Sequence, residues 1–250
     1  MYYSMIKLLI IIIFSILVSL YTIFDAIFFS IVYFFNKNLV LRHSIRVIKF
    51  IFNFLIAIAG VKVNVTGTEN LHSLDNEKSY MVISNHRGFF DIISGYQLFD
   101  KNIGIVAKKS IGNYIVVRYW MKRINCLFLD RNNLRDGVKV VIDSINNINN
   151  GISMWIFPEG TRCKSDNPLD LLEFKKGAFK IPEKTNCYIL PISFKNTDDV
   201  FEKQKPFLKP SNIYINIGKP YRISDLNDED KLYISEYSQN VIRKLLMEDN

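Results

Sequence analysis

The sequence predicts an α/β fold in which a mainly parallel sheet is flanked by helices and preceded by an N-terminal hydrophobic, membrane-anchoring helical segment. From about residue 63 onwards, short apolar runs rich in β-branched residues alternate with helical patterns, which is typical of layered domains with parallel strands. Before them, residues 8–24 form a run of 17 uncharged residues, close to the ~20 that cross a hydrocarbon core. We therefore expect anchoring helices over 1–60 and one globular domain over 61–250.

Composition excludes several classes of protein. The chain has 250 residues, of which 22% are charged and 49% are apolar, so it can bury a core and is not a disordered chain. Its three cysteines, Cys126, Cys163 and Cys187, form no CxxC pair. This spacing argues against a disulfide scaffold or a zinc ribbon and favours reducing surroundings.

The net charge of +8 is unevenly distributed. Residues 1–68 carry six basic side chains and one acid, Asp25, whereas residues 69–250 carry 26 basic and 23 acidic side chains. A nucleic-acid-binding domain would be basic over its folded part, so we expect no nucleic-acid partner. The positive charge lies beside the hydrophobic segment instead.

The hydrophobic segment is expected to be a retained anchor. It contains no Pro or Gly between Lys7 and Lys37, and its apolar run is longer than the ~7–15 residues of a signal peptide, with no clear AxA cleavage site after it. Asp25 interrupts the run. Since an acid near the bilayer centre costs ~2.5–3.5 kcal/mol, we expect Asp25 to end the apolar stretch locally, near an interface or at a bend between two shorter helices.

A second apolar segment, 39–60, carries a basic stripe. Arg42, Arg46, Lys49 and Asn53 are spaced by 4, 3 and 4 residues, which places them on one face of a helix. Such a stripe suits a membrane interface with anionic headgroups, and an ordinary docking helix of the globular domain is the alternative. By the positive-inside rule, the basic residues between Lys37 and Thr68 predict a membrane localisation with the globular domain on the cytoplasmic side.

The globular part is expected to alternate strands and helices. The expected strands are 80–84, 103–107, 126–129, 152–157, 187–194 and 213–218. Helices are expected over 91–99, 111–122 and 134–147, partly over 175–184 with Pro182 ending or bending the helix, and from Asp225 onwards. Ligands of parallel sheets bind outside the carboxyl ends of the strands, so reactive side chains at these ends are the candidates for chemistry.

His86 and Asp91 come directly after the expected strand 80–84, in the segment SNHRGFFD. A neutral imidazole takes a proton from an alcohol near pH 7 when a carboxylate holds its other ring nitrogen. The spacing of five works if His86 lies in the turn and Asp91 opens the next helix, where an acid also caps the N-terminus. Taken alone, the pair is better explained as a surface histidine and a capping aspartate. His43 and His72 have no comparable setting.

Three more groups of polar residues follow expected strands. They are Lys108 and Lys109 in VAKKSI, Arg131 in LFLDRNN, and Glu159, Gly160, Thr161 and Arg162 in IFPEGTR. The arginines and one lysine can converge on a phosphate, since arginine forms two parallel hydrogen bonds to it, and Gly160 permits close approach of a backbone. Each group taken alone is also explained as charged residues on a solvent-exposed loop, but their repeated position at strand ends favours a functional site.

NHRGFFD, LDR, FPEGTR and YILPISF, in this order, resemble the four motif blocks of the glycerophospholipid acyltransferases, whose typical member is the 1-acylglycerol-3-phosphate acyltransferase. The resemblance covers about residues 60–220, and FPEGTR is its most specific element. The segment between His86 and Asp91, Arg87 to Phe90, departs from the frequent variants that contain Ser or Trp. The departure leaves the histidine and the aspartate in place but makes the acceptor and acyl preference less predictable.

The resemblance implies a role for each candidate. His86 would be the general base on the acceptor hydroxyl, and Asp91 would orient it and stabilise its charged form. Arg131, Glu159, Gly160, Thr161 and Arg162 would bind the phosphate end of the acceptor, directly or by ordering the loop, together with Lys108 or Lys109. Pro191 falls in the fourth block, whose role is structural or lines the acyl chain.

The implied reaction moves a fatty acyl group from acyl-CoA or acyl-ACP to the hydroxyl of 1-acylglycerol-3-phosphate and yields phosphatidic acid. We expect direct transfer, with no cofactor beyond the co-substrate and no metal, and with membrane lipids, the lysophospholipid acceptor and the acyl donor as partners. No GxSxG elbow of a lipase is present. Acylation of another lysophospholipid, transacylation between lipids, and an inactive lipid-binding membrane protein are the alternatives.

Overall fold

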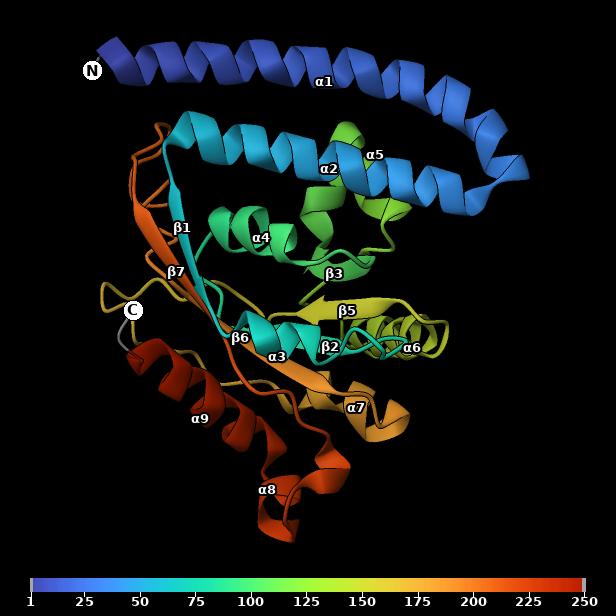
Figure 1. Ribbon diagram of the computed structural model, residues 1–250, viewed down its shortest axis with the longest axis vertical. Helices are drawn as coiled ribbons and strands as arrows, with labels where there is room; N and C mark the ends of the chain where they lie inside the picture. Colours follow the sequence, from blue (N-terminus) through green and yellow to red (C-terminus); the bar gives the residue numbers. More distant parts are fainter. Residues whose placement is uncertain (1, 249–250) are drawn as a thin grey trace.

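The computed structural model describes residues 2–248. A helical hairpin lies along one side of a twisted sheet, and further helices cover both faces of that sheet (Figure 1). The hairpin consists of α1 (Tyr2–Phe35) and α2 (Lys37–Ala59). Asn36 joins the two helices and caps α2 by accepting a hydrogen bond from the backbone N–H of Leu39, as short polar residues do at helix N-termini. Gly60 ends α2 in the left-handed conformation at φ 74°, which favours glycine.

The sheet has seven strands in the order β1-β7-β6-β2-β5-β3-β4. Their bounds are β1 (Lys62–Thr66), β2 (Met81–Ser84), β3 (Ile103–Lys108), β4 (Leu127–Leu129), β5 (Ser153–Ile156), β6 (Ile189–Lys195) and β7 (Asn212–Ile217). All neighbouring pairs are parallel except β6 with β7. Val82 of β2 pairs with Trp155 of β5 on one side and with Leu190 of β6 on the other. The five strands from β6 to β4 therefore end at one common edge.

The remaining helices divide between the two faces of the sheet (Figure 1). Those on the side of α2 are α3 (Thr68–His72), α4 (Phe89–Gly95) and α5 (Ile115–Arg123), and those on the other side are α6 (Leu134–Asn149), α7 (Lys180–Thr185) and α9 (Ile234–Met247), preceded by the short α8 (Asp228–Leu232). Four 3₁₀ turns are described besides these: η1 (Tyr96–Leu98), η2 (Lys109–Asn113), η3 (Lys176–Phe179) and η4 (Ile223–Asp225).

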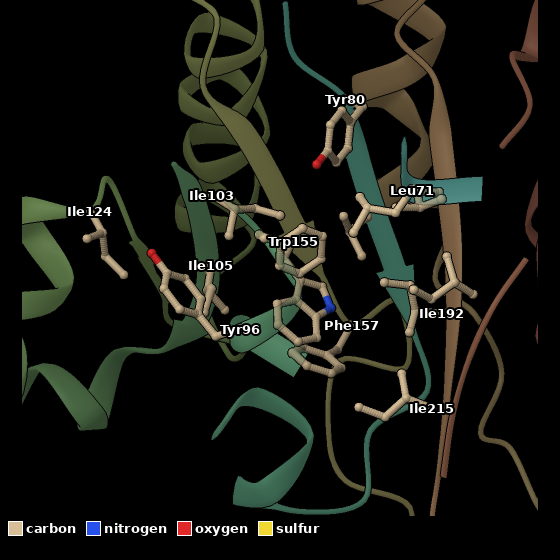
Figure 2. Close-up of a cluster of buried hydrophobic side chains, with 14 of the residues drawn as sticks. Leu71, Tyr80, Tyr96, Ile103, Ile105, Ile124, Trp155, Phe157, Ile192 and Ile215 are labelled. Carbon is tan, nitrogen blue, oxygen red and sulfur yellow. The ribbon is translucent and has the colours of Figure 1, made fainter. Parts of the chain in front are cut away.

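The core consists of separate layers because alternate residues of a strand face opposite sides. Val82 and Trp155 belong to the layer under α2 and α5, whereas Met81 and Met154 belong to the layer under α6 and α9. Figure 2 shows the first layer, with the rings of Trp155 and Phe157 side by side at its centre. Their ring centroids lie 5.4 Å apart. Phe157 follows directly on β5, so the core extends to the edge where the strands end.

The predicted fold class and the six predicted strands are confirmed, with shifts of one or two residues at their ends. β1 was not predicted, because KVNVT alternates polar and apolar residues over only five positions. The expectation for Pro182 is wrong, since α7 runs from Lys180 to Thr185. Proline lies in the first turn of this helix, where its missing N–H removes no intrahelical bond.

The expectation that Asp25 ends the apolar stretch is also wrong. The helix α1 continues without a break to Phe35, and Asp25 is fully buried against α2 and α5. Its carboxylate accepts hydrogen bonds from His43 Nε2 and from the Tyr119 hydroxyl, both at 2.6 Å, and lies 3.5 Å from a guanidinium nitrogen of Arg123. A buried acid is tolerated inside an apolar helix when partners satisfy it in this way.

Among the described residues, α1 is the one helix that is long and apolar enough to cross a membrane, over Ser4–Phe35. Most of its large apolar side chains face away from the protein. Beneath it, α2 packs on α4 and α5 through Ile48 and its neighbours, while Arg42 and Arg46 stay exposed. The segment thus docks on the domain and also exposes three of the four residues of its stripe, Arg42, Arg46 and Asn53.

Candidate active site

The polar groups singled out in the sequence follow β2, β5, β3 and β4, which are consecutive neighbours in the sheet. Because these strands are parallel, the groups gather at one edge, the carboxyl end of the sheet. The segment that follows β6 reaches the same edge, since β6 is the other neighbour of β2. The site is therefore built from five loops on one rigid sheet.

His86 and Asp91 form a direct hydrogen bond, with Nδ1 and Oδ2 2.7 Å apart. Asp91 is the third residue of α4 and is fully buried. Its Oδ2 also accepts the backbone N–H groups of Arg87 at 2.7 Å and Gly88 at 2.9 Å, and its Oδ1 accepts the hydroxyl of Thr197. Since the carboxylate is fixed by four donors, it fixes the histidine ring in turn and leaves Nε2 as the nitrogen that can take up a proton.

The backbone of His86 is held by the FPEGTR segment. Its N–H donates to Glu159 Oε1 at 2.7 Å, and its carbonyl accepts from the N–H of Cys163 at 2.8 Å. The imidazole ring packs on Phe157, with the two ring centroids 4.2 Å apart. The loop after β5 therefore holds His86 through both its backbone N–H and its backbone carbonyl.

Glu159 points into the domain rather than toward an open site. Its second oxygen accepts the N–H of Leu172 at 2.8 Å, so both oxygens bind backbone groups. Burial raises the pKa of Glu159 to about 7, and the hydrogen bonds from Leu172 and His86 oppose that shift. Of the two roles that the sequence left open for Glu159, this geometry favours ordering of the loop over direct contact with a phosphate.

Arg162 packs on the start of α4, which follows β2, and pairs with the segment that follows β6. Its guanidinium carbon is 4.1 Å from the centre of the Phe89 ring, a cation–π contact, and its NH1 is 3.2 Å from Glu202 Oε1. Arg131 follows β4, and burial together with the positive charge of nearby Arg162 lowers the pKa of Arg131. The two arginines from different strands therefore converge, as expected of an anion site.

The other predicted site residues lie around this centre. Gly160 forms the turn after β5 with φ 69°, a conformation that favours glycine, and Thr161 beside it is exposed. Lys108 is exposed at the end of β3, and Lys109 lies 3.4 Å from Asp130 Oδ2. Direct contacts thus join His86 to Asp91 and Glu159, whereas both lysines face solvent at the neighbouring strand ends.

Four residues of the site were missed from the sequence: Arg87, Thr197, Asp198 and Glu202. The side chain of Arg87 is fully buried and donates to Asp198 Oδ2 at 2.9 Å and to the carbonyl of Ser165 at 2.5 Å. Burial lowers the pKa of Arg87, but the hydrogen bond that Arg87 donates to Asp198, together with the negative charge of Asp198, more than offsets this effect and raises the pKa. Three of the four follow β6, and the strand-end rule used for the other strands would have found them.

Within residues 2–248, no three His, Cys, Asp or Glu side chains are grouped as ligands for a metal ion. The chemistry that the arrangement offers is proton transfer at His86 Nε2, at the same sheet edge as two arginines that can bind a phosphate.

Comparison with known proteins gives consistent results. A family model described as Acyltransferase matches residues 62–195. The chain is 30% identical over 183 residues to a 1-acyl-sn-glycerol-3-phosphate acyltransferase of Saccharomyces cerevisiae, an alignment that covers 73% of this chain and 58% of the yeast protein. It is 29% identical over 189 residues to a protein of the same name from Borreliella burgdorferi, covering 76% of this chain and 73% of that protein. This chain thus spans little more than half the length of the yeast protein.

The fold also has a solved counterpart. The crystal structure of the 1-acyl-sn-glycerophosphate (LPA) acyltransferase, PlsC, from Thermotoga maritima superposes with a TM-score of 0.70 and covers 94% of this chain and 95% of that chain. The two sequences are 23% identical, so the likeness shows a shared fold.

Proposed function

This chain belongs to the acyltransferase family, and from that premise we propose that it acylates 1-acylglycerol-3-phosphate to phosphatidic acid. The donor is the thioester of a fatty acid with coenzyme A or acyl carrier protein. The names of the relatives from yeast and Borreliella support the choice of acceptor. The single observation that carries the proposal is the buried His86–Asp91 pair, with Arg162 and Arg131 beside it at the same sheet edge.

The proposed reaction is a direct acyl transfer. The acceptor hydroxyl attacks the thioester carbonyl while His86 Nε2 takes its proton, so that a C–O bond forms and the C–S bond breaks. The proton then passes from His86 to the departing thiolate. Asp91 stabilises the imidazolium that forms in between, because its Oδ2 lies 2.7 Å from Nδ1. Much of the rate gain comes from holding the hydroxyl and the thioester together.

Arg162 and Arg131 are proposed to bind the acceptor phosphate. An arginine presents two parallel N–H groups to a phosphate, and Phe89 holds the Arg162 guanidinium flat while one edge is bonded to Glu202. The other N–H groups of Arg162 are proposed to donate to the phosphate, which would position the glycerol hydroxyl near His86.

We further propose that α1 and α2 hold the site at a membrane, with the catalytic domain on the cytoplasmic side. The apolar outer face of α1 and the exposed Arg42 and Arg46 on α2 support contact with acyl chains and anionic headgroups. An acceptor that stays in the bilayer then needs no transfer into water.

The proposal is tested with the purified full-length protein in mixed micelles and a panel of acceptors. The panel contains 1-acylglycerol-3-phosphate, a lysophospholipid with a diester headgroup and phosphate-free 1-acylglycerol, each with acyl-CoA and with acyl-ACP. We expect turnover chiefly of the first acceptor. Arg162→Ala should raise its KM by about 10- to 100-fold, because a charge-assisted bidentate contact is lost, and should change turnover of 1-acylglycerol little.

Equal losses on the phosphate-bearing and phosphate-free acceptors would contradict the role of Arg162. Preferred turnover of the diester lysophospholipid would identify a different acceptor. Lipid binding without turnover of any acceptor would point to an inactive lipid-binding protein.

A further inference from the structure

Glu202 supplies a carboxylate to the arginine that is proposed to bind phosphate. It lies in the segment between β6 and β7, and its Oε1 is 3.2 Å from NH1 of Arg162. The same oxygen accepts the N–H of Phe89 at 3.0 Å. Only 13% of the Glu202 side chain is exposed, against 26% for Arg162. This ion pair is therefore more shielded from water than an ordinary surface pair.

The carboxylate is seated in a space left by Gly88. A Cβ at position 88 would overlap Glu202 Oε2, so the missing side chain lets the carboxylate rest on the turn between His86 and Asp91. Among the described residues, Oε2 is buried without a hydrogen-bond partner. Burial raises the pKa of Glu202. The protein therefore provides partners for only one of the two oxygens of the Glu202 carboxylate, which makes the charged form costly to bury.

The neighbouring acid in the same segment is not available to Arg162. Asp198 is bonded to Arg87 at 2.9 Å and lies 3.1 Å from Lys203 Nζ. Glu202 is thus the carboxylate that neutralises Arg162 while no acceptor is bound.

We propose that Glu202 is a built-in counter-ion that competes with the acceptor phosphate for Arg162 and thereby sets the affinity of this site for phosphate-bearing acceptors. The inference rests on the proposed function, because it takes Arg162 as the phosphate ligand. In the free enzyme, Glu202 keeps the guanidinium from being an unpaired, half-buried cation and holds it over Phe89. When a phosphate arrives, its negative charge meets that of Glu202, and some of the binding energy is lost to this repulsion.

The sign of the expected effect distinguishes this role from a structural one. Glu202→Gln keeps the size of the side chain and an oxygen for the Phe89 N–H, but removes the charge. If Glu202 competes with phosphate, the variant binds phosphate more tightly, by about three- to tenfold for a partly shielded charge. If Glu202 only supports the loop, its replacement loosens Arg162 and weakens binding.

The experiment measures sn-glycerol 3-phosphate binding to the full-length protein in detergent by calorimetry, which requires no turnover. Asp199→Asn is the matched control, since Asp199 is in the same segment and pairs with Lys203 instead of Arg162. We expect tighter binding in Glu202→Gln, unchanged binding in Asp199→Asn, and no gain from Glu202→Gln when Arg162→Gln is also present. The KM for 1-acylglycerol-3-phosphate should fall in parallel, with the KM for 1-acylglycerol unchanged.

Unchanged or weaker binding in Glu202→Gln, or an equal gain in Asp199→Asn, would overturn the inference. So would a wild-type protein that does not bind sn-glycerol 3-phosphate. Failure of the proposed function alone appears differently, as tighter binding in Glu202→Gln without acylation of the lysophospholipid. If Glu202→Gln does not fold, Gly88→Ala replaces it, because its Cβ would overlap the Glu202 carboxylate and displace it from its present seat, which should also tighten binding.

Discussion

Within residues 2–248, two histidine–aspartate pairs of nearly the same length each contain a fully buried aspartate, and we propose a chemical role for only one of them. His86 and Asp91 are 2.7 Å apart at the carboxyl edge of the sheet, and His43 and Asp25 are 2.6 Å apart between the hairpin and α5. Both aspartates are fully buried. The contact itself therefore does not identify an active site.

The two pairs differ in the nitrogen that is used. His86 binds its aspartate through Nδ1, so Nε2 remains for a substrate. His43 uses Nε2 for Asp25 and also for the hydroxyl of Tyr21, at 3.0 Å. The face of the His43 ring is covered by Phe29 at 4.0 Å between centroids. The Nε2 atom of His43 is therefore shared between two protein groups, and one face of its ring is covered.

The partners of the two aspartates differ as well. Asp91 is bound by two backbone N–H groups and a threonine hydroxyl besides His86. Asp25 has Arg123 and Tyr119 beside it. Near these groups the indole N–H of Trp120 donates to Thr22 at 2.9 Å. The first set of partners fits the role of base proposed for His86, whereas the second set joins α1 to the domain.

The strongest test of this difference compares the two histidines. We expect His86→Ala to lower kcat for acyl transfer by about 10²- to 10⁴-fold, the usual contribution of a general base. His43→Ala should leave kcat within a few-fold of wild type, because its pair lies outside the site. Steady-state kinetics on both variants in the same detergent measure the contrast. Comparable losses in kcat for the two variants would erase the distinction drawn between the pairs.

The converse test concerns stability. Asp25→Ala leaves Arg123, His43 and Tyr119 without their common partner, and loss of one member of a buried ion pair typically costs about 3–5 kcal/mol. We expect the free energy of unfolding to fall by about that amount, with Trp120 fluorescence reporting release of α1. Ser19→Ala is the control, since Ser19 is exposed on the same helix and bonds only to the backbone of Ser15. The idea of a fastening role is wrong if both variants are equally stable.

A smaller effect concerns the pH dependence of the free energy of unfolding, which reports on Glu159, the residue that binds the backbone of His86. The pKa of Glu159 is about 7 in the folded protein against an ordinary 4.5, so the folded state keeps this proton more tightly between those values. The free energy of unfolding should therefore fall as pH rises from about 4.5 to about 7, by roughly 3 kcal/mol, and this part should stay level above pH 7. Below pH 4.5 this contribution is fully present and no longer depends on pH, because Glu159 is protonated in both the folded and the unfolded state.

Denaturant unfolding of wild type and Glu159→Gln across this pH range isolates that contribution. The variant should be less stable at low pH, since it loses one of two backbone hydrogen bonds, but its pH slope should be shallower. Identical slopes in the two proteins would show that Glu159 does not titrate in this way.

The comparison also explains what the sequence could and could not predict. β2, β5 and β6 were predictable because a buried parallel strand reads as a continuous apolar run. His86 and Asp91 could be paired in advance since both lie in one turn of the chain. The orientation of Glu159 could not, because it depends on the backbone of Leu172 and on how deeply the loop is buried.

Contacts between distant segments account for the remaining errors. In the sequence, Asp25 interrupts an apolar run and has no visible partner. The residues that bind it, His43 and Tyr119, lie 18 and 94 residues away along the chain. Thr197 and Glu202 carry no motif of their own, and they reach the site only because β6 is the neighbour of β2. In both cases the sheet order and the docking of α1, rather than local pattern, decide the role of the side chain.

The central claim is that this chain acylates 1-acylglycerol-3-phosphate through His86, and complementation tests it most directly. Wild type and His86→Ala are expressed in a conditional strain that lacks this acylation, and growth and phosphatidic acid are measured at equal amounts of membrane-bound protein. We predict that wild type restores both and that His86→Ala restores neither. Rescue by His86→Ala, or no phosphatidic acid from membrane-bound wild type, would contradict the claim.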